Sequence, residues 1–265
     1  MVYLSGYGQD TYILSFPKGE LVGQIGGGGH LCPDNAGNVW IGGYPNGTSD
    51  EMVEFSHGGT TPIKTLDLPD RVYNCAVDHT TGNLAVIFGD HGVDVFSGGS
   101  PPQTLATGVD FYAGSCTYDG SGNLFLLGGF RKPNHPLGVV ELVKRTKKFE
   151  RLWGYHNNQN YSSIQWDGKY ITIGTGLFMT PGVSRYAVRG NNLRPVGGLG
   201  FKRGIHDLGA YWISGSKIVA TSAGYGIFPP ASVYSYPRGW HRVETIGRGV
   251  VPSSSYTSIA ISTAP

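Results

Sequence analysis

A tight polar turn followed by a short apolar strand recurs along the chain and limits the folds that it can adopt. The pattern is Asp-x-x-Gly-Asn followed by apolar residues. It is clearest at 34–43, 78–86 (where the turn is one residue longer) and 119–126, with weaker echoes at 166–171 and 212–219. The turn glycines are 40–47 residues apart. A period of this length, filled by about four short strands, is typical of one blade of a β-propeller.

The composition supports an all-β fold. Of 265 residues, 43 are glycine and only 14% are charged. Each glycine inside a helix would cost about 1 kcal/mol relative to alanine, whereas short strands joined by tight turns need glycine. Closed all-β folds of this length commonly form one domain. We therefore predict a single β-propeller domain spanning residues 1–265.

The two ends of the chain complete each other. Each internal repeat is interpreted as four strands, A to D in chain order, with the polar turn between A and B. Residues 2–25 contain B, C and D strands without an A strand, and residues 256–261 form an A strand with no partner after it. Joined, these segments make one complete blade and remove an open sheet edge.

We therefore predict a six-bladed β-propeller of four-stranded antiparallel blades, closed by the C-terminal strand completing the N-terminal blade. Blade 1 is expected to combine 1–27 with 255–262. The expected ranges of blades 2–6 are 29–67, 72–106, 112–153, 160–198 and 205–247.

The repeated Asp-x-x-Gly-Asn turn and its apolar strands resemble the NHL-repeat six-bladed β-propellers over essentially the whole chain. The resemblance implies the architecture, while the superfamily includes scaffolds, ligand binders, lactonases and lyases. The match to the regucalcin and gluconolactonase branch is poor. Those enzymes hold a divalent metal with a Glu and an Asn/Asp set, and the first strand of this chain, 2–6, has no Glu. A loose likeness to streptogramin lyase illustrates the His/Glu chemistry that such a ring can perform.

The charge balance bounds the partners. The net charge of +2 offers no bulk electrostatic case for binding nucleic acid or acidic lipid. The basic run at 144–148 is interpreted as a solvated hairpin turn. We expect a monomer with a small-molecule or glycan ligand, no nucleic-acid partner and no membrane partner.

The three cysteines, Cys32, Cys75 and Cys116, do not form an even disulfide framework, and no CxxC spacing is present. We expect all three to be small buried thiols. The lysine-poor surface, rich in Gly, Ser, Thr, Asn and Tyr, is typical of an exported protein. We expect a secreted or periplasmic protein whose signal segment is replaced by Met1 in this sequence.

The polar residues divide between the two faces of the expected ring. Asp34, Asp78 and Asp119 lie in A–B turns, where we expect Asx turns rather than calcium loops. The D–A and B–C connections gather at the opposite mouth of the channel, where ligands usually bind. The candidate ligand-binding residues are Tyr7, Asp10, His30, Tyr44, Tyr73, Asp90, Tyr112, Phe130, Asp207, Tyr225 and Tyr256. A tyrosine at such a position can also simply plug the funnel.

Three functions are compatible with this mouth. Aromatic rings with Asn, Asp and Arg suit a glycan or small aromatic ligand. The alternative is a lyase or hydrolase using acid–base chemistry, with candidate catalytic residues His206, His91, His135, Tyr161 and Arg131. A protein-interaction scaffold is the third. No cofactor is predicted, although a divalent metal at a cluster of His30, His91, His135 and His206 stays an open alternative.

Overall fold

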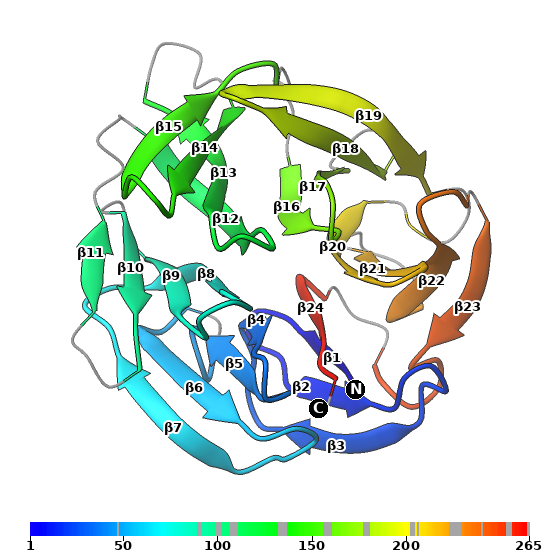
Figure 1. Ribbon diagram of the computed structural model, residues 1–265. Coiled ribbons are helices and arrows are strands. Elements are labelled where there is room, and N and C mark those ends of the chain that lie inside the picture. The colour runs from blue at the N-terminus through cyan, green and yellow to red at the C-terminus, as the bar shows by residue number, and fades with distance from the viewer. Residues whose placement is uncertain are drawn as a thin grey trace.

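The computed structural model describes residues 1–46, 48–88, 92–98, 102–105, 111–131, 137–155, 161–176, 181–201, 205, 207–222, 229–239, 241–252 and 256–263, with only the backbone of Tyr161 and Ser162. The described strands form six four-stranded sheets around a ring (Figure 1). The prediction of an all-β, six-bladed propeller is confirmed. Within the described ranges no helix is long and apolar enough to cross a membrane.

The strands are conveniently grouped by their place in the blade. The innermost strands are β24 (Ser258–Ile261), β4 (His30–Pro33), β8 (Val72–Val77), β12 (Phe111–Tyr118), β16 (Tyr161–Trp166) and β20 (Leu208–Ser214). The second strands are β1 (Val2–Ser5), β5 (Val39–Gly42), β9 (Leu84–Phe88), β13 (Leu124–Phe130), β17 (Ile171–Thr175) and β21 (Lys217–Ser222). The third strands are β2 (Thr11–Leu14), β6 (Glu51–Phe55), β10 (Val93–Phe96), β14 (Leu137–Val143), β18 (Gly182–Arg189) and β22 (Ala231–Ser235). The outermost strands are β3 (Leu21–Ile25), β7 (Pro62–Asp67), β11 (Gln103–Leu105), β15 (Lys148–Leu152), β19 (Asn192–Gly200) and β23 (Arg242–Ile246).

Blade 1 is completed by the end of the chain. Strand β24 pairs antiparallel with β1, with Val2 opposite Ile261 and Ser5 opposite Ser258. The N-terminal amine donates to the carbonyl of Ser262 at 2.6 Å, and Ser262 N–H donates back to the carbonyl of Met1 at 2.9 Å. The two termini lie side by side in Figure 1. The predicted closure is confirmed.

The recurring polar turns are Asx turns, as predicted. Asp34 Oδ1 accepts the N–H groups of Ala36 at 2.9 Å and Asn38 at 2.7 Å. Asp119 holds its turn in the same way. The turn glycines Gly37 and Gly122 have φ values of 85° and 80°, a conformation that few other residues adopt without strain. The repeated motif therefore marks a backbone requirement rather than a metal site.

Neighbouring blades are joined by apolar packing and by side-chain hydrogen bonds. Six hydrophobic clusters of described residues each combine side chains from two adjacent blades. The inner strands belong to different sheets, so side-chain oxygen atoms accept backbone N–H groups across the gap. Each acceptor, with the residue whose N–H it accepts, is Ser258 (Leu31, 2.9 Å), Asn74 (Cys116, 3.3 Å), Ser115 (Ile164, 3.2 Å) and Gln165 (Ile213, 3.1 Å). Thr221 Oγ1 donates to the carbonyl of Tyr256 at 2.7 Å between blades 6 and 1.

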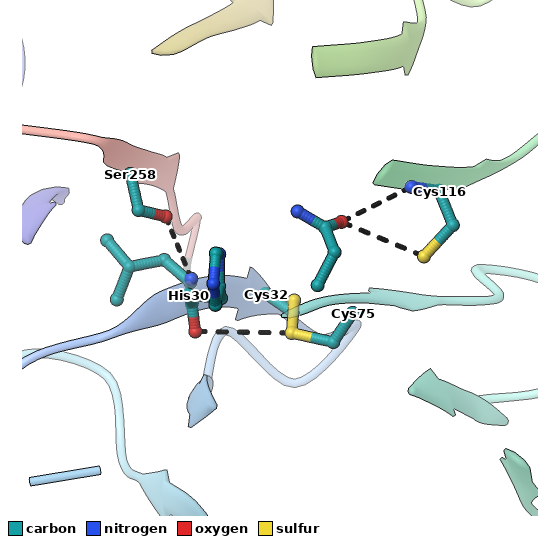
Figure 2. The surroundings of a disulfide bond; sticks show 7 residues. His30, Cys32, Cys75, Cys116 and Ser258 are labelled. Atoms are coloured by element: carbon teal, nitrogen blue, oxygen red, sulfur yellow. Dashed lines mark hydrogen bonds between the residues drawn. A yellow bond between two sulfur atoms is a disulfide. The ribbon is translucent and has the colours of Figure 1, made fainter. Parts of the chain in front are cut away.

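A disulfide joins blades 2 and 3. Cys32 of β4 is bonded to Cys75 of β8, with a Cα–Cα distance of 5.9 Å (Figure 2). The expectation of three free thiols was wrong for these two, because the ring places equivalent positions of successive inner strands beside each other. Cys116 is free and buried, as expected. Burial raises the pKa of its thiol, so Cys116 stays protonated.

A buried carboxyl group makes the stability of blade 4 depend on pH. Glu141 of β14 is 9% exposed and lies opposite Glu150 of β15. Burial, followed by the charges of Asp119 and Glu150, raises the pKa of Glu141 to about 7. The unfolded chain therefore ionises this group at lower pH than the folded protein does. Its contribution to stability falls as pH rises from about 4.3 towards 7 and stays reduced above that range.

We expect Glu141→Gln to be more stable than the parent protein above neutral pH, by on the order of 2 kcal/mol, and to lose this advantage below about pH 4. Denaturant unfolding at acidic and mildly alkaline pH measures the difference. Glu150→Gln is the control. It removes an exposed neighbouring charge and should change stability by only a few tenths of a kcal/mol. Equal destabilisation by Glu141→Gln at both pH values would contradict this explanation.

Candidate functional site

A cavity of about 540 Å³ runs through the centre of the ring, lined by residues from all six inner strands. Its wall combines the disulfide, aromatic rings, hydroxyl groups and the amides of Asn74 and Gln165. No Asp, Glu, Lys or Arg lines it in the part of the chain that the structure describes. The cavity is thus polar without being charged, and its volume lies in the range typical of small-molecule sites.

A Tyr–His pair stands at one mouth of this cavity. Tyr7 follows β1 and His30 begins β4, so the ends of two adjacent blades bring them together. The Tyr7 hydroxyl and His30 Nε2 are hydrogen-bonded at 2.9 Å, and the rings meet edge to face at 5.5 Å. Burial, and then the charge of Arg71, lower the pKa of His30 to about 4. The imidazole is therefore neutral near pH 7.

Arg71 supplies the positive charge at this mouth. It precedes β8, and its guanidinium carbon lies 5.7 Å from the ring centroid of Tyr7 and 5.3 Å from that of Tyr73. Burial raises the pKa of Tyr7, and the charge of Arg71 with its hydrogen bond to the phenol offsets this only in part. The phenol stays protonated. Tyr7 and Tyr73 are 41% and 38% exposed, so both rings remain accessible.

Polar groups of the deeper wall are partly occupied by the contacts between blades. Asn74 and Ser115 accept N–H groups from the next blade. Gln165 bonds to blade 6 through both ends of its amide, with Nε2 donating to the carbonyl of Tyr211 at 2.6 Å. Ser163 Oγ is different, because it is buried without a hydrogen-bond partner among the described residues. A buried hydroxyl in this state is costly unless water or a ligand meets it.

Three predicted ligand-binding residues, Tyr7, His30 and Tyr73, line the cavity. Two others bind the loops between blades 1 and 2. Asp10 Oδ1 accepts the N–H of Gly27 at 3.1 Å, and the Tyr44 hydroxyl donates to the carbonyl of Gly26 at 3.0 Å. The described lining includes neither side chain.

Phe130 and Tyr256 belong to the core, which corrects their assignment to the ligand-binding rim. Phe130 is 3% exposed and packs on Phe111 at 4.9 Å between ring centroids. Tyr256 is fully buried and donates its hydroxyl hydrogen to the carbonyl of Pro252 at 3.0 Å. Both rings fill space between strands, as the plug interpretation of such residues describes.

The remaining predicted residues lie away from the cavity or outside the described ranges. Tyr112 stacks on Arg131 at 4.0 Å, and neither they nor Asp207 line the cavity. Six predicted residues are not placed, namely Asp90, His91, His135, His206, Tyr225 and the side chain of Tyr161. Among the described residues, no group of three or more His, Cys, Asp and Glu could hold a metal ion. The alternative of a His cluster involves three of the unplaced residues and stays untested.

Sequence reasoning overlooked Arg71, Ser163 and Gln165. Arg71 stands directly before an inner strand, in the same D–A connections that yielded Tyr73 and His30, so its position was a usable signal. Ser163 and Gln165 lie inside β16, which reads Tyr-Ser-Ser-Ile-Gln-Trp. A polar residue inside an inner strand is the general signal for the channel wall.

Comparison with solved structures supports the propeller fold. The β-propeller domain of Myceliophteria thermophila Cps50 (Swd1) matches 97% of this chain and 84% of its own, with a TM-score of 0.63 and 9% identity. A protein of unknown function from Bacteroides caccae matches 97% of both chains, with a TM-score of 0.68 and 12% identity. A chain of a Mitotic Checkpoint Complex structure matches 83% of this chain and 68% of its own, at 0.58 and 16%.

No protein-family model and no curated protein sequence matches the chain. At the identities of these solved structures, the similarity indicates the architecture alone, which is compatible with either ligand binding or a protein-interaction scaffold.

Proposed function

We propose that this propeller binds a small-molecule or glycan ligand in its central cavity, with the mouth at Tyr7, His30 and Tyr73. The observation that carries the proposal is the cavity of about 540 Å³, walled by uncharged polar groups and aromatic rings from six strands. Specific small-molecule sites combine largely apolar walls with a few placed polar groups. Tyr73 offers an exposed ring for stacking, and Ser163 offers an unpaired hydroxyl.

The second candidate is acid–base catalysis, supported by the hydrogen bond between Tyr7 and His30. With its pKa lowered to about 4, His30 is neutral at physiological pH and can accept a proton, while Tyr7 is protonated and can donate one. A lyase or hydrolase of the superfamily with NHL-like repeats would need such a pair. Binding ranks first because it requires only the cavity that these residues line.

We further propose that the protein works in an oxidising compartment, secreted or periplasmic. The Cys32–Cys75 disulfide supports this, because structural disulfides persist chiefly outside reducing cytosol.

The proposal is tested with Tyr73→Ala and a closely matched control, Tyr112→Ala. The two tyrosines are 38% and 37% exposed, are the second residues of β8 and β12, and each stacks on an arginine. Only Tyr73 lines the cavity. Ligand-observed NMR with a panel of neutral monosaccharides and substituted phenols measures binding.

We expect Tyr73→Ala to weaken binding of the panel's best probe by about tenfold or more, through loss of a stacking ring, and Tyr112→Ala to leave affinity within about twofold. Unfolding temperatures of both variants should match the parent protein. Equal effects of the two substitutions, or failure of the whole panel to bind, would refute the cavity as the binding site.

A further inference from the structure

The positive charge of Arg71 has no carboxylate partner among the described residues. The two ion pairs found there are Lys144–Asp78 and Arg185–Asp167. The nearest carboxyl group in sequence, Asp70, accepts the backbone N–H of Arg71 at 2.7 Å. The guanidinium instead lies between two tyrosine rings and beside a neutral imidazole. A cation at the rim of an uncharged cavity therefore stands without a counter-charge in this part of the chain.

Arg71 also has an unused donor. Its Nε is buried and has no hydrogen-bond partner within the described ranges. Leaving such a donor unpaired costs about 1–3 kcal/mol, and more when the group is charged. The planar guanidinium, with its Nε–H and Nη–H groups pointing the same way, matches the two oxygen atoms of a carboxylate.

We propose that Arg71 binds a carboxylate carried by the cavity ligand, so that the ligand is a monoanion with an uncharged aromatic or polyhydroxylated body. This inference rests on the proposed function, because the body occupies the same cavity. One guanidinium without a second cation beside it suits a singly charged planar carboxylate better than a phosphate. The rings of Tyr7 and Tyr73 keep the guanidinium plane in place and shield it from water.

The test compares two probes of nearly the same shape, 4-hydroxybenzoate and 4-hydroxybenzamide, by NMR titration near neutral pH and at low salt. Arg71→Met removes the charge while keeping an unbranched apolar chain. Arg71→Lys keeps the charge without the planar fork. Arg131→Met is the matched control, because Arg131 stacks on Tyr112 as Arg71 stacks on Tyr73 and does not line the cavity.

We expect the parent protein and Arg131→Met to bind the benzoate at least about tenfold tighter than the benzamide, the factor of one charge-assisted hydrogen-bonded pair. Arg71→Met should bind both probes with the affinity of the benzamide, and Arg71→Lys should retain part of the preference. Loss of benzamide binding by Arg71→Met would overturn the inference, since it would mean that the cavity itself had changed.

Two further outcomes separate the inference from the proposed function. If the parent protein binds both probes equally, the cavity site stands and the carboxylate assignment fails. If phenyl phosphate binds more tightly than 4-hydroxybenzoate, the carboxylate assignment also fails. If neither these probes nor the neutral panel binds, both proposals fail together.

Discussion

Deleting residues 256–265 is expected to abolish cooperative unfolding. The deletion removes β24 and with it the fourth strand of blade 1, which leaves the inner edge of β1 unpaired. It also removes the buried side chains of Tyr256, Ile259 and Ile261. Burial of three such side chains contributes about 5–8 kcal/mol, comparable to the whole stability of a typical domain at about 5–15 kcal/mol.

Circular dichroism during heating and limited proteolysis measure this effect. The control deletes 263–265 only, because the last paired residue, Ser262, is then retained. This shorter deletion should unfold like the parent protein. A synthetic peptide of residues 252–265, added to the longer deletion, should restore protease resistance. A sharp unfolding transition of the longer deletion without peptide would contradict the role of β24 in closing the ring.

Removing the disulfide, by Cys32→Ala with Cys75→Ala, is expected to lower the free energy of unfolding by about 3–4 kcal/mol. The bonded residues are 43 positions apart, and closing a loop of that length in the unfolded chain accounts for about 4 kcal/mol. For a chain of this size, a loss of about 3 kcal/mol lowers the unfolding temperature by roughly 6–12 °C. Denaturant unfolding and calorimetry both measure the loss.

Two controls isolate the covalent bond from the packing of its sulfur atoms. A reducing agent should destabilise the parent protein and leave the double variant unchanged. Cys116→Ala should retain the sensitivity to reductant, because Cys116 is not part of the bond. If the parent protein unfolds identically with and without reductant, while mass analysis shows the bond to be reduced, the disulfide does not contribute to stability.

The architecture could be predicted because its signals are local. Each Asp-x-x-Gly-Asn turn requires a carboxylate that accepts nearby N–H groups and a glycine at positive φ, both readable within five residues. The closing strand was readable as well, since 2–25 lacks an inner strand and 256–261 supplies one. Such patterns depend on neighbours in sequence.

The site was predicted only in part, because its contacts join different blades. Tyr7, His30 and Tyr73 were found from their position at the ends of inner strands. The pairing of Cys32 with Cys75 depends on how two strands from successive blades align across the channel, which no local pattern states. Phe130 and Tyr256 occupy equally suitable sequence positions, yet the tilt of their strands turns both rings into the core.

A crystal structure of the protein grown with a saturating concentration of 4-hydroxybenzoate tests the central claim most directly. We expect the probe inside the cavity, with its ring beside Tyr73 and its carboxylate within hydrogen-bond distance of Arg71 Nε. Probe density found only on the outer surface, with water alone between the inner strands, would contradict a ligand site in the centre of the ring.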